Sequence, residues 1–150
     1  MIVSFDTNVL VYATAPVSVA KAARARDVLA RGMRAGESVL LLQTLAEFAN
    51  VAIRKAGIPV DDVRAAIDAW RAVLPVRPAE EADLPAALDA VKAHRLAFRD
   101  AVLWAAARRV GVRSLLTEDF QDGFALDGVR FVNPFMPAND RLIDEILPQS

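Results

Sequence analysis

Short apolar runs alternate with longer stretches of helical periodicity along this chain. IVSF and SVLLLQ are typical of buried strands, whereas the stretch after SVLLLQ places Leu45, Phe48 and Ala52 on one helical face. Strands are predicted over residues 2–5, 38–43, 74–78, 112–117 and 129–133. Helices are predicted over residues 19–36, 44–57, 59–73, 80–94 and 98–111, and within the tail. This alternation predicts an α/β fold with a mostly parallel central sheet of about five strands flanked by helices.

Length and composition indicate one folded domain over residues 1–150 of the chain. We expect the tail from about residue 134 to pack on this domain or on a dimer interface. The residues are 55% hydrophobic and 25% charged, and no apolar run reaches the length of a membrane span, so no membrane partner is expected. The absence of cysteine is typical of a protein of the reducing cytoplasm, which is the expected location.

The same composition excludes several kinds of catalytic site. With no cysteine and only one histidine, His94, the chain has no Cys–His pair, no thiolate zinc site and no multi-histidine metal site. The glycine-rich motifs that cradle nucleotide phosphates are also absent. Any catalysis must therefore depend on carboxylates, hydroxyls, amides and basic side chains.

Four acidic residues lie where predicted strands end or where helices begin. Asp6 follows the first strand, Asp119 follows the strand over 112–117, and Glu47 lies in the first turn after the second strand. Asp100 lies near the start of the helix over 98–111. Because ligands of parallel sheets bind beyond the carboxyl ends of the strands, we expect these carboxylates to meet at one edge.

A cluster of this kind needs a neutralising partner. Two carboxylates about 4 Å apart repel by roughly 4 kcal/mol at an effective dielectric constant of about 20. A site with only oxygen ligands suits Mg²⁺ or Mn²⁺, which can activate a water and hold a phosphodiester for attack. The four acids therefore indicate metal-assisted hydrolysis of a phosphate ester.

Each acid also has a purely structural interpretation. Thr44 and Glu47 match a capping box, and Asp6 could form an Asx turn at the end of its strand. Asp119 could belong to an ordinary acidic loop, and Asp100 could interact with a helix dipole. The metal hypothesis therefore depends on the common placement of the four acids, and not on any one of them.

The segments that carry these acids resemble the motifs of PIN domains, particularly the VapC-type toxins of bacterial toxin–antitoxin pairs. DTNVLVY is similar to the opening D-[ST]-N-x-L motif, and QTLAEFANVAIRK to the second motif, with Glu47 as its acid. HRLAFRDAVLWAAA resembles the third motif, and LLTEDFQDG the fourth, where Asp119 follows Thr117 at T-x-D spacing. VRFVNPF is similar to a closing strand of these proteins. The likeness covers essentially the whole chain, in the order and spacing of the family.

The resemblance implies a Mg²⁺- or Mn²⁺-dependent endoribonuclease, the toxin of a type II pair, acting on RNA as a homodimer and inhibited by a cognate antitoxin. It implies that Asp6, Asp100 and Asp119 hold the metal, and that Glu47 completes the cluster and orients or deprotonates the attacking water. Candidates for orienting these carboxylates are Thr7, Asn8, Thr117 and Asp122. Arg99 departs from the pattern, since an aromatic or small residue is expected before Asp100. An antitoxin could inhibit the site by placing an arginine among the acids.

Two other classes of protein stay open at this point. One is a PIN-fold module that binds a partner but has lost catalysis. The other is an aspartyl-phosphate protein, either a phosphatase of the haloacid-dehalogenase type or a receiver domain. Such a phosphatase requires a second aspartate two residues after the first, whereas this chain has Asn8, and VRSLLTED lacks the late lysine of a receiver domain.

Overall fold

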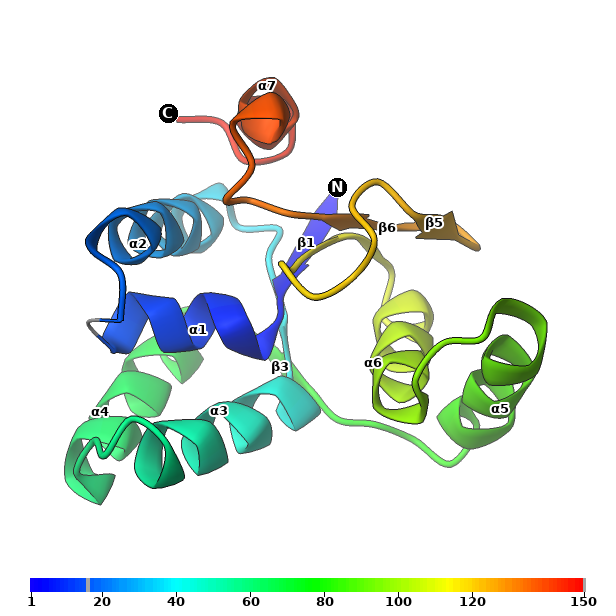
Figure 1. Cartoon of the computed structure of the whole chain (residues 1–150), viewed down its shortest axis with the longest axis horizontal. Helices are drawn as coiled ribbons and strands as arrows, with labels where there is room; N and C mark the ends of the chain where they lie inside the picture. Colours follow the sequence, from blue (N-terminus) through cyan, green and yellow to red (C-terminus); the bar gives the residue numbers. More distant parts are fainter. Residues whose placement is uncertain (16, 150) are drawn as a thin grey trace.

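The computed structural model describes residues 1–15 and 17–149 and contains the alternation of strands and helices that the sequence predicts (Figure 1). Its strands are β1 (Ile2–Phe5), β2 (Leu40–Leu41), β3 (Val76–Arg77), β4 (Val112–Leu116), β5 (Ala125–Leu126) and β6 (Val129–Val132). Its helices are α1 (Thr7–Thr14), α2 (Val19–Ala35), α3 (Leu42–Arg54), α4 (Val60–Arg71), α5 (Asp83–His94), α6 (Phe98–Arg109), the 3₁₀ turn η1 (Pro137–Asn139) and α7 (Asp140–Ile146). None of the helices in these described ranges has both the length and the apolar character required to cross a bilayer.

The strands form a mostly parallel layer, as predicted. β1 pairs with β4 and β4 with β6, all in parallel, and β5 adds an antiparallel edge beside β6. β2 and β3 form a parallel two-stranded sheet, which a parallel bridge between Val3 and Ser38 joins to β1. The carboxyl ends of β1, β2 and β4 therefore lie toward one edge of the layer, where ligands of parallel sheets bind.

Helices cover both faces of the layer, because successive side chains of a strand point to opposite sides. Val3 and Phe5 of β1 belong to a core shared with α1–α4 and α7. Val112 and Leu115 of β4 belong to a second core, shared with α5 and α6. Figure 1 shows the same division, with α1–α4 on one side of β1 and with α5 and α6 on the other.

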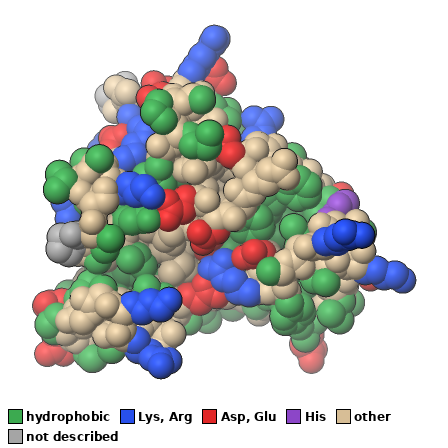
Figure 2. Space-filling view, viewed as in Figure 1, with side chains coloured by type: hydrophobic (Ala, Val, Ile, Leu, Met, Phe, Trp, Pro, Cys, Tyr) green, Lys and Arg blue, Asp and Glu red, His purple; other side chains and the backbone are tan. Residues whose placement is uncertain are grey.

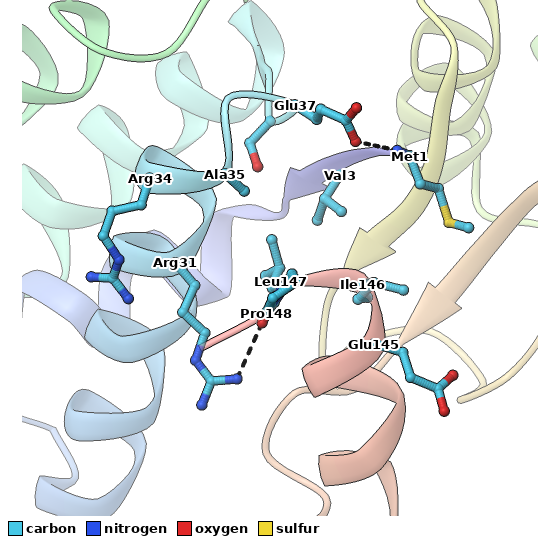
Figure 3. A pocket seen from close by; sticks show the side chains of 11 residues that line it. Met1, Val3, Arg31, Arg34, Ala35, Glu37, Glu145, Ile146, Leu147 and Pro148 are labelled. Carbon is cyan, nitrogen blue, oxygen red and sulfur yellow. Dashed lines mark hydrogen bonds and ion pairs between the residues drawn. The ribbon is translucent and has the colours of Figure 1, made fainter. Parts of the chain in front are cut away.

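The tail packs on the domain through α7. Ile143 and Leu147 are buried in the core that α2 also lines. Arg31 on α2 donates from Nη1 to Asp144 Oδ1 at 2.7 Å and to the Leu147 carbonyl at 3.3 Å. A cavity of about 530 Å³ lies between this tail, the end of α2 and Met1 (Figure 3). Because Met1 precedes β1, this cavity lies at the opposite end of the strand from the predicted acid cluster.

The predictions miss two elements, α1 and β5. The residues of α1, TNVLVYAT, include several of modest helix propensity, so no helix was expected there. Burial of Val9 and Leu10 in the core stabilises the helix despite that propensity. β5 contains only two residues within a turn-rich segment, too few to show a strand period.

The second strand is shorter than predicted, and this changes the interpretation of Glu47. β2 ends at Leu41, and α3 already begins at Leu42. Thr44 therefore lies inside the helix, so the capping-box interpretation is wrong. Its Oγ1 is buried and has no hydrogen-bond partner within the described ranges. Glu47 is thus free of a capping role.

α2 approaches β1 closely because Gly32 has no side chain. A Cβ atom at this position would lie 2.6 Å from Cζ of Phe5 and 2.9 Å from Oγ of Ser38. Both of these residues are buried, so neither side chain can move away into solvent. The close contact fixes α2 against the strand that leads to Asp6.

Gly32→Ala is therefore expected to lower the free energy of unfolding by about 1–3 kcal/mol, the typical cost of overpacking. Helix propensity alone predicts the opposite sign, a gain of roughly 1 kcal/mol. Urea unfolding decides between the two, with Ala23→Gly at an exposed position of the same helix as the control. If Gly32→Ala gains as much stability as Ala23→Gly loses, the close contact does not constrain the fold.

Candidate active site

Asp6 is fully buried at the junction of β1 and α1, and its carboxylate has three hydrogen-bond donors. Oδ1 accepts from the backbone N–H of Thr7 at 2.7 Å and from Arg99 Nη2 at 3.0 Å. Oδ2 accepts from Thr117 Oγ1 at 2.9 Å. A buried carboxylate is costly unless it is paired and hydrogen-bonded, and these contacts meet both needs.

Thr117 connects Asp6 to Asp119. Because β4 runs parallel beside β1, Thr117 at the end of β4 lies next to Asp6 at the end of β1. Thr117 Oγ1 accepts from Asn8 Nδ2 and from the backbone N–H of Asp119, both at 3.1 Å. Asn8 Nδ2 also lies 3.1 Å from Asp119 Oδ2, to which it donates. Asn8 and Thr117 therefore contact the carboxylates that they were predicted to orient.

Glu47 reaches the same region from α3. Thr7 Oγ1 donates to Glu47 Oε2 at 3.0 Å and lies 3.4 Å from the Thr44 carbonyl. Thr7 therefore connects the start of α1 to α3. It contacts Asp6 through its backbone N–H and Glu47 through its hydroxyl, so it bridges the two acids.

Arg99, in the first turn of α6, joins three of the four predicted acids. Its Nη2 pairs with Asp6, and its Nη1 lies 2.9 Å from Asp100 Oδ1. Its Nε donates to Glu47 Oε1 at 2.9 Å, and Nη2 pairs with Glu47 as well. In the sequence, Arg99 is recognisable only as a departure from the motif. The spacing of residues along the chain does not reveal that its long side chain contacts acids on three different elements.

The ion pairs keep both partners charged. Partial burial by itself would raise the pKa of Glu47, but the hydrogen bonds and positive charge of Arg99 outweigh burial and hold that pKa below its ordinary value of 4.5. Burial likewise opposes the charge on Arg99, yet Glu47, Asp6 and Asp100 raise the pKa of the guanidinium above its ordinary value. Glu47 and Arg99 are thus both ionised at neutral pH.

Asp122 lies apart from this network. Its Oδ1 accepts from the backbone N–H of Asn133 and from Asn139 Nδ2, both at 2.8 Å. These bonds hold the loop after β4 against the start of the tail. In the described hydrogen bonds, Asp122 contacts none of the four acids.

Figure 2 shows acidic and basic side chains side by side near the centre of the face that is viewed, between the groups of helices that cover the two sides of the sheet.

The residue types fit a hard divalent cation, because every side chain that could bind one offers oxygen. The arrangement in this conformation holds a guanidinium instead. Among residues 1–15 and 17–149, no three acidic or histidine side chains lie close enough together to hold an ion. Asp6 and Asp100 are paired with this guanidinium, whereas Asp119 has no contact with it in the described hydrogen bonds and ion pairs.

Comparison with known proteins identifies the family of the fold. The model of the PIN-domain family matches residues 3–125, a range that includes all four acids. Comparison with curated protein sequences finds no match.

Three solved structures share the fold at low sequence identity. VapC20 of Mycobacterium tuberculosis, described as a sarcin–ricin loop cleaving toxin, has a TM-score of 0.58 at 16% identity, over 75% of this chain and 86% of that one. A toxin–antitoxin complex from Klebsiella pneumoniae has a TM-score of 0.63 at 19% identity, over 88% and 97% of the two chains. FitAB bound to a DNA fragment has a TM-score of 0.64 at 22% identity, over 91% and 96%. With the family model covering most of its length, the chain belongs to the PIN-domain family.

Proposed function

We propose that this chain is a divalent-cation-dependent endoribonuclease that hydrolyses RNA phosphodiester bonds in the cytoplasm as the toxin of a toxin–antitoxin pair. The observation that carries the proposal is the convergence of Asp6, Glu47 and Asp100 on one guanidinium, with Asp119 linked to Asp6 through Thr117. Acids from four separate segments meet at the carboxyl edge of the sheet. A structural salt bridge needs only one of them.

In this proposal Asp6, Asp100 and Asp119 hold Mg²⁺ or Mn²⁺, directly or through water. The bound cation would lower the pKa of a coordinated water and neutralise charge on the phosphodiester. Glu47 orients the attacking water and takes its proton. Thr7 holds the Glu47 carboxylate through its hydroxyl, which leaves one carboxylate oxygen for that water once Arg99 has moved.

The hydroxyl of Thr117 and the side-chain amide of Asn8 orient the carboxylates of Asp6 and Asp119. Thr117 donates to Asp6 and accepts from Asn8, so its hydroxyl proton is committed to the buried carboxylate. Asn8 donates to Asp119 in turn, which holds that more exposed carboxylate toward the cluster. Position 8 thus supplies a donor where an aspartyl-phosphate phosphatase needs a second carboxylate, so that alternative gains no support.

RNA is proposed as the substrate because one structural neighbour, VapC20, is described as cleaving the sarcin–ricin loop. The second candidate function is a PIN module that binds a partner without catalysis. One observation favours it: Arg99 already gives Asp6, Glu47 and Asp100 a shared counter-ion, so these three acids are paired without a cation. Cation-dependent cleavage separates the two functions.

The proposed partners are a cognate antitoxin and a second copy of this chain. The antitoxin is supported by a neighbour of the same fold that is described as a toxin–antitoxin complex. The second copy is proposed from the resemblance to PIN-domain toxins alone. An antitoxin arginine could meet the same acids that Arg99 meets here, through charge-assisted hydrogen bonds.

Asp6→Asn, Asp100→Asn and Asp119→Asn are each expected to reduce Mn²⁺-dependent RNA cleavage by more than about 100-fold, because each removes a proposed cation ligand. The assay uses a panel of structured RNAs and protein freed of antitoxin, after circular dichroism has shown that each variant is folded. Asp122→Asn is the matched control, an acid of the same loop as Asp119 outside the cluster, and should cleave at the wild-type rate. Equal cleavage by wild type and the three cluster variants would place the activity elsewhere.

Co-expression with the protein encoded beside this chain is expected to yield a complex in which cleavage is suppressed. Light scattering of the chain alone is expected to give twice its mass of 16.2 kDa. Full nuclease activity at a saturating ratio of that protein would contradict the antitoxin assignment. A monomer mass at micromolar concentration would contradict the homodimer.

A further inference from the structure

The geometry points to Arg99 as a built-in counter-ion that competes with the divalent cation, so that docking of Arg99 and binding of the cation exclude each other. This inference rests on the proposed function, because it requires the acids to be a cation site. It adds a control that the proposed function does not contain: the chain sets its own cation affinity through one side chain.

All three nitrogens of the Arg99 guanidinium contact acidic side chains. Nε and Nη2 contact Glu47, Nη1 contacts Asp100, and Nη2 also contacts Asp6. The planar fork thus spans carboxylates from α3, from α6 and from the end of β1. An arginine fixed by three acids is a specific arrangement, because its five N–H groups point in set directions.

Arg99 occupies an oxygen of two of the three proposed cation ligands, Oδ1 of Asp6 and Oδ1 of Asp100. Asp6 Oδ1 already accepts from the Thr7 backbone and from Arg99, and Asp6 Oδ2 accepts from Thr117. The contacts from Thr7 and Thr117 belong to the start of α1 and the end of β4, whereas the Arg99 contact comes from a partly exposed side chain on α6. A guanidinium and a divalent cation that share these oxygens would also repel each other at short range.

The Arg99 side chain has a way to leave the acids. The side chain is 37% exposed, so it has a path into solvent. Its backbone carbonyl accepts from Gln43 Nε2 at 3.3 Å, a contact that holds the start of α6 against α3 when the side chain leaves. Phe98, the preceding residue, is exposed as well. The docked and released forms can therefore interconvert within one fold.

Competition of this kind multiplies the apparent cation affinity by the fraction of molecules in which Arg99 is released. Removing the guanidinium removes that penalty. Arg99→Gln is therefore expected to bind Mn²⁺ at least about tenfold more tightly than wild type, if Arg99 is docked in nine-tenths or more of the molecules. The same variant should lose thermal stability without cation and regain it when Mn²⁺ is added, because three acids are left without their counter-ion.

The test is Mn²⁺ binding to the purified full chain, measured by electron paramagnetic resonance of free Mn²⁺. Arg54→Gln is the control, since it removes a positive charge from an exposed position on α3 for which no ion pair is seen in the described ranges. It should bind as wild type does. Asp6→Asn, alone and combined with Arg99→Gln, should abolish the tight binding and so place the ion at this cluster.

Equal affinities for wild type and Arg99→Gln would overturn the inference, and weaker binding by Arg99→Gln would show instead that Arg99 supports the site. No Mn²⁺ binding by any variant would overturn both the inference and the cation-dependent function. Metal-dependent cleavage by wild type together with equal affinities would retain the function and reject only the inference.

A second measurement follows Arg99 in the wild-type chain and uses a variant only to assign its signal. In ¹⁵N spectra of the arginine side chains, the Nε–H signal missing from Arg99→Lys identifies Arg99. Mg²⁺ is expected to move this signal to the position of a solvent-exposed arginine. A signal that does not move while Mg²⁺ binds would show that both cations occupy the cluster together, against the inference.

Discussion

A carboxylate that is completely buried at the end of β1 is the constraint on which the rest of the site depends. Asp6 has no solvent exposure, so its charge is stable only if neighbouring groups compensate for it. The backbone of Thr7, the hydroxyl of Thr117 and the guanidinium of Arg99 do so from three different parts of the chain. Each of these groups then determines the position of another acid.

The fold brings these groups together through its parallel strands. β1 and β4 are neighbours that run in one direction, so Asp6 and Thr117 leave the sheet side by side. α1 and α6 both begin at this edge, which places Thr7, Asn8 and Asp100 there as well. α3 begins directly after β2 and carries Glu47 one turn later. The acid cluster is thus a consequence of the sheet topology and of the short connections at its carboxyl edge.

The sequence predicts the strands with continuous apolar runs and the helices with clear periodicity, because those signals are local. It fails for α1, whose helix depends on burial of Val9 and Leu10, and for β5, which is too short to have a period. It also fails for the capping box, because the length of β2 is set by pairing with β3 and not by the apolar run. The errors for α1 and for the capping box come from contacts between residues far apart in the sequence, whereas the β5 error comes from its length.

For the site, strand ends predict which acids lie near one another, but not what neutralises them. The role of Arg99 depends on the path of its side chain to Asp6, Glu47 and Asp100, which spacing does not reveal. Asp122 shows the converse, since it lies near Asp119 in sequence but binds Asn133 and Asn139. Proximity in the sequence is therefore a poor guide to which acid of a loop joins a cluster.

The most direct test of the cation site is anomalous diffraction from a crystal soaked in Mn²⁺. The expected result is a manganese peak bounded by carboxylate oxygens of Asp6, Asp100 and Asp119, with the Arg99 side chain turned into solvent. A crystal in which Arg99 still contacts Asp6 and Glu47, with no peak at the cluster in saturating Mn²⁺, would contradict the account.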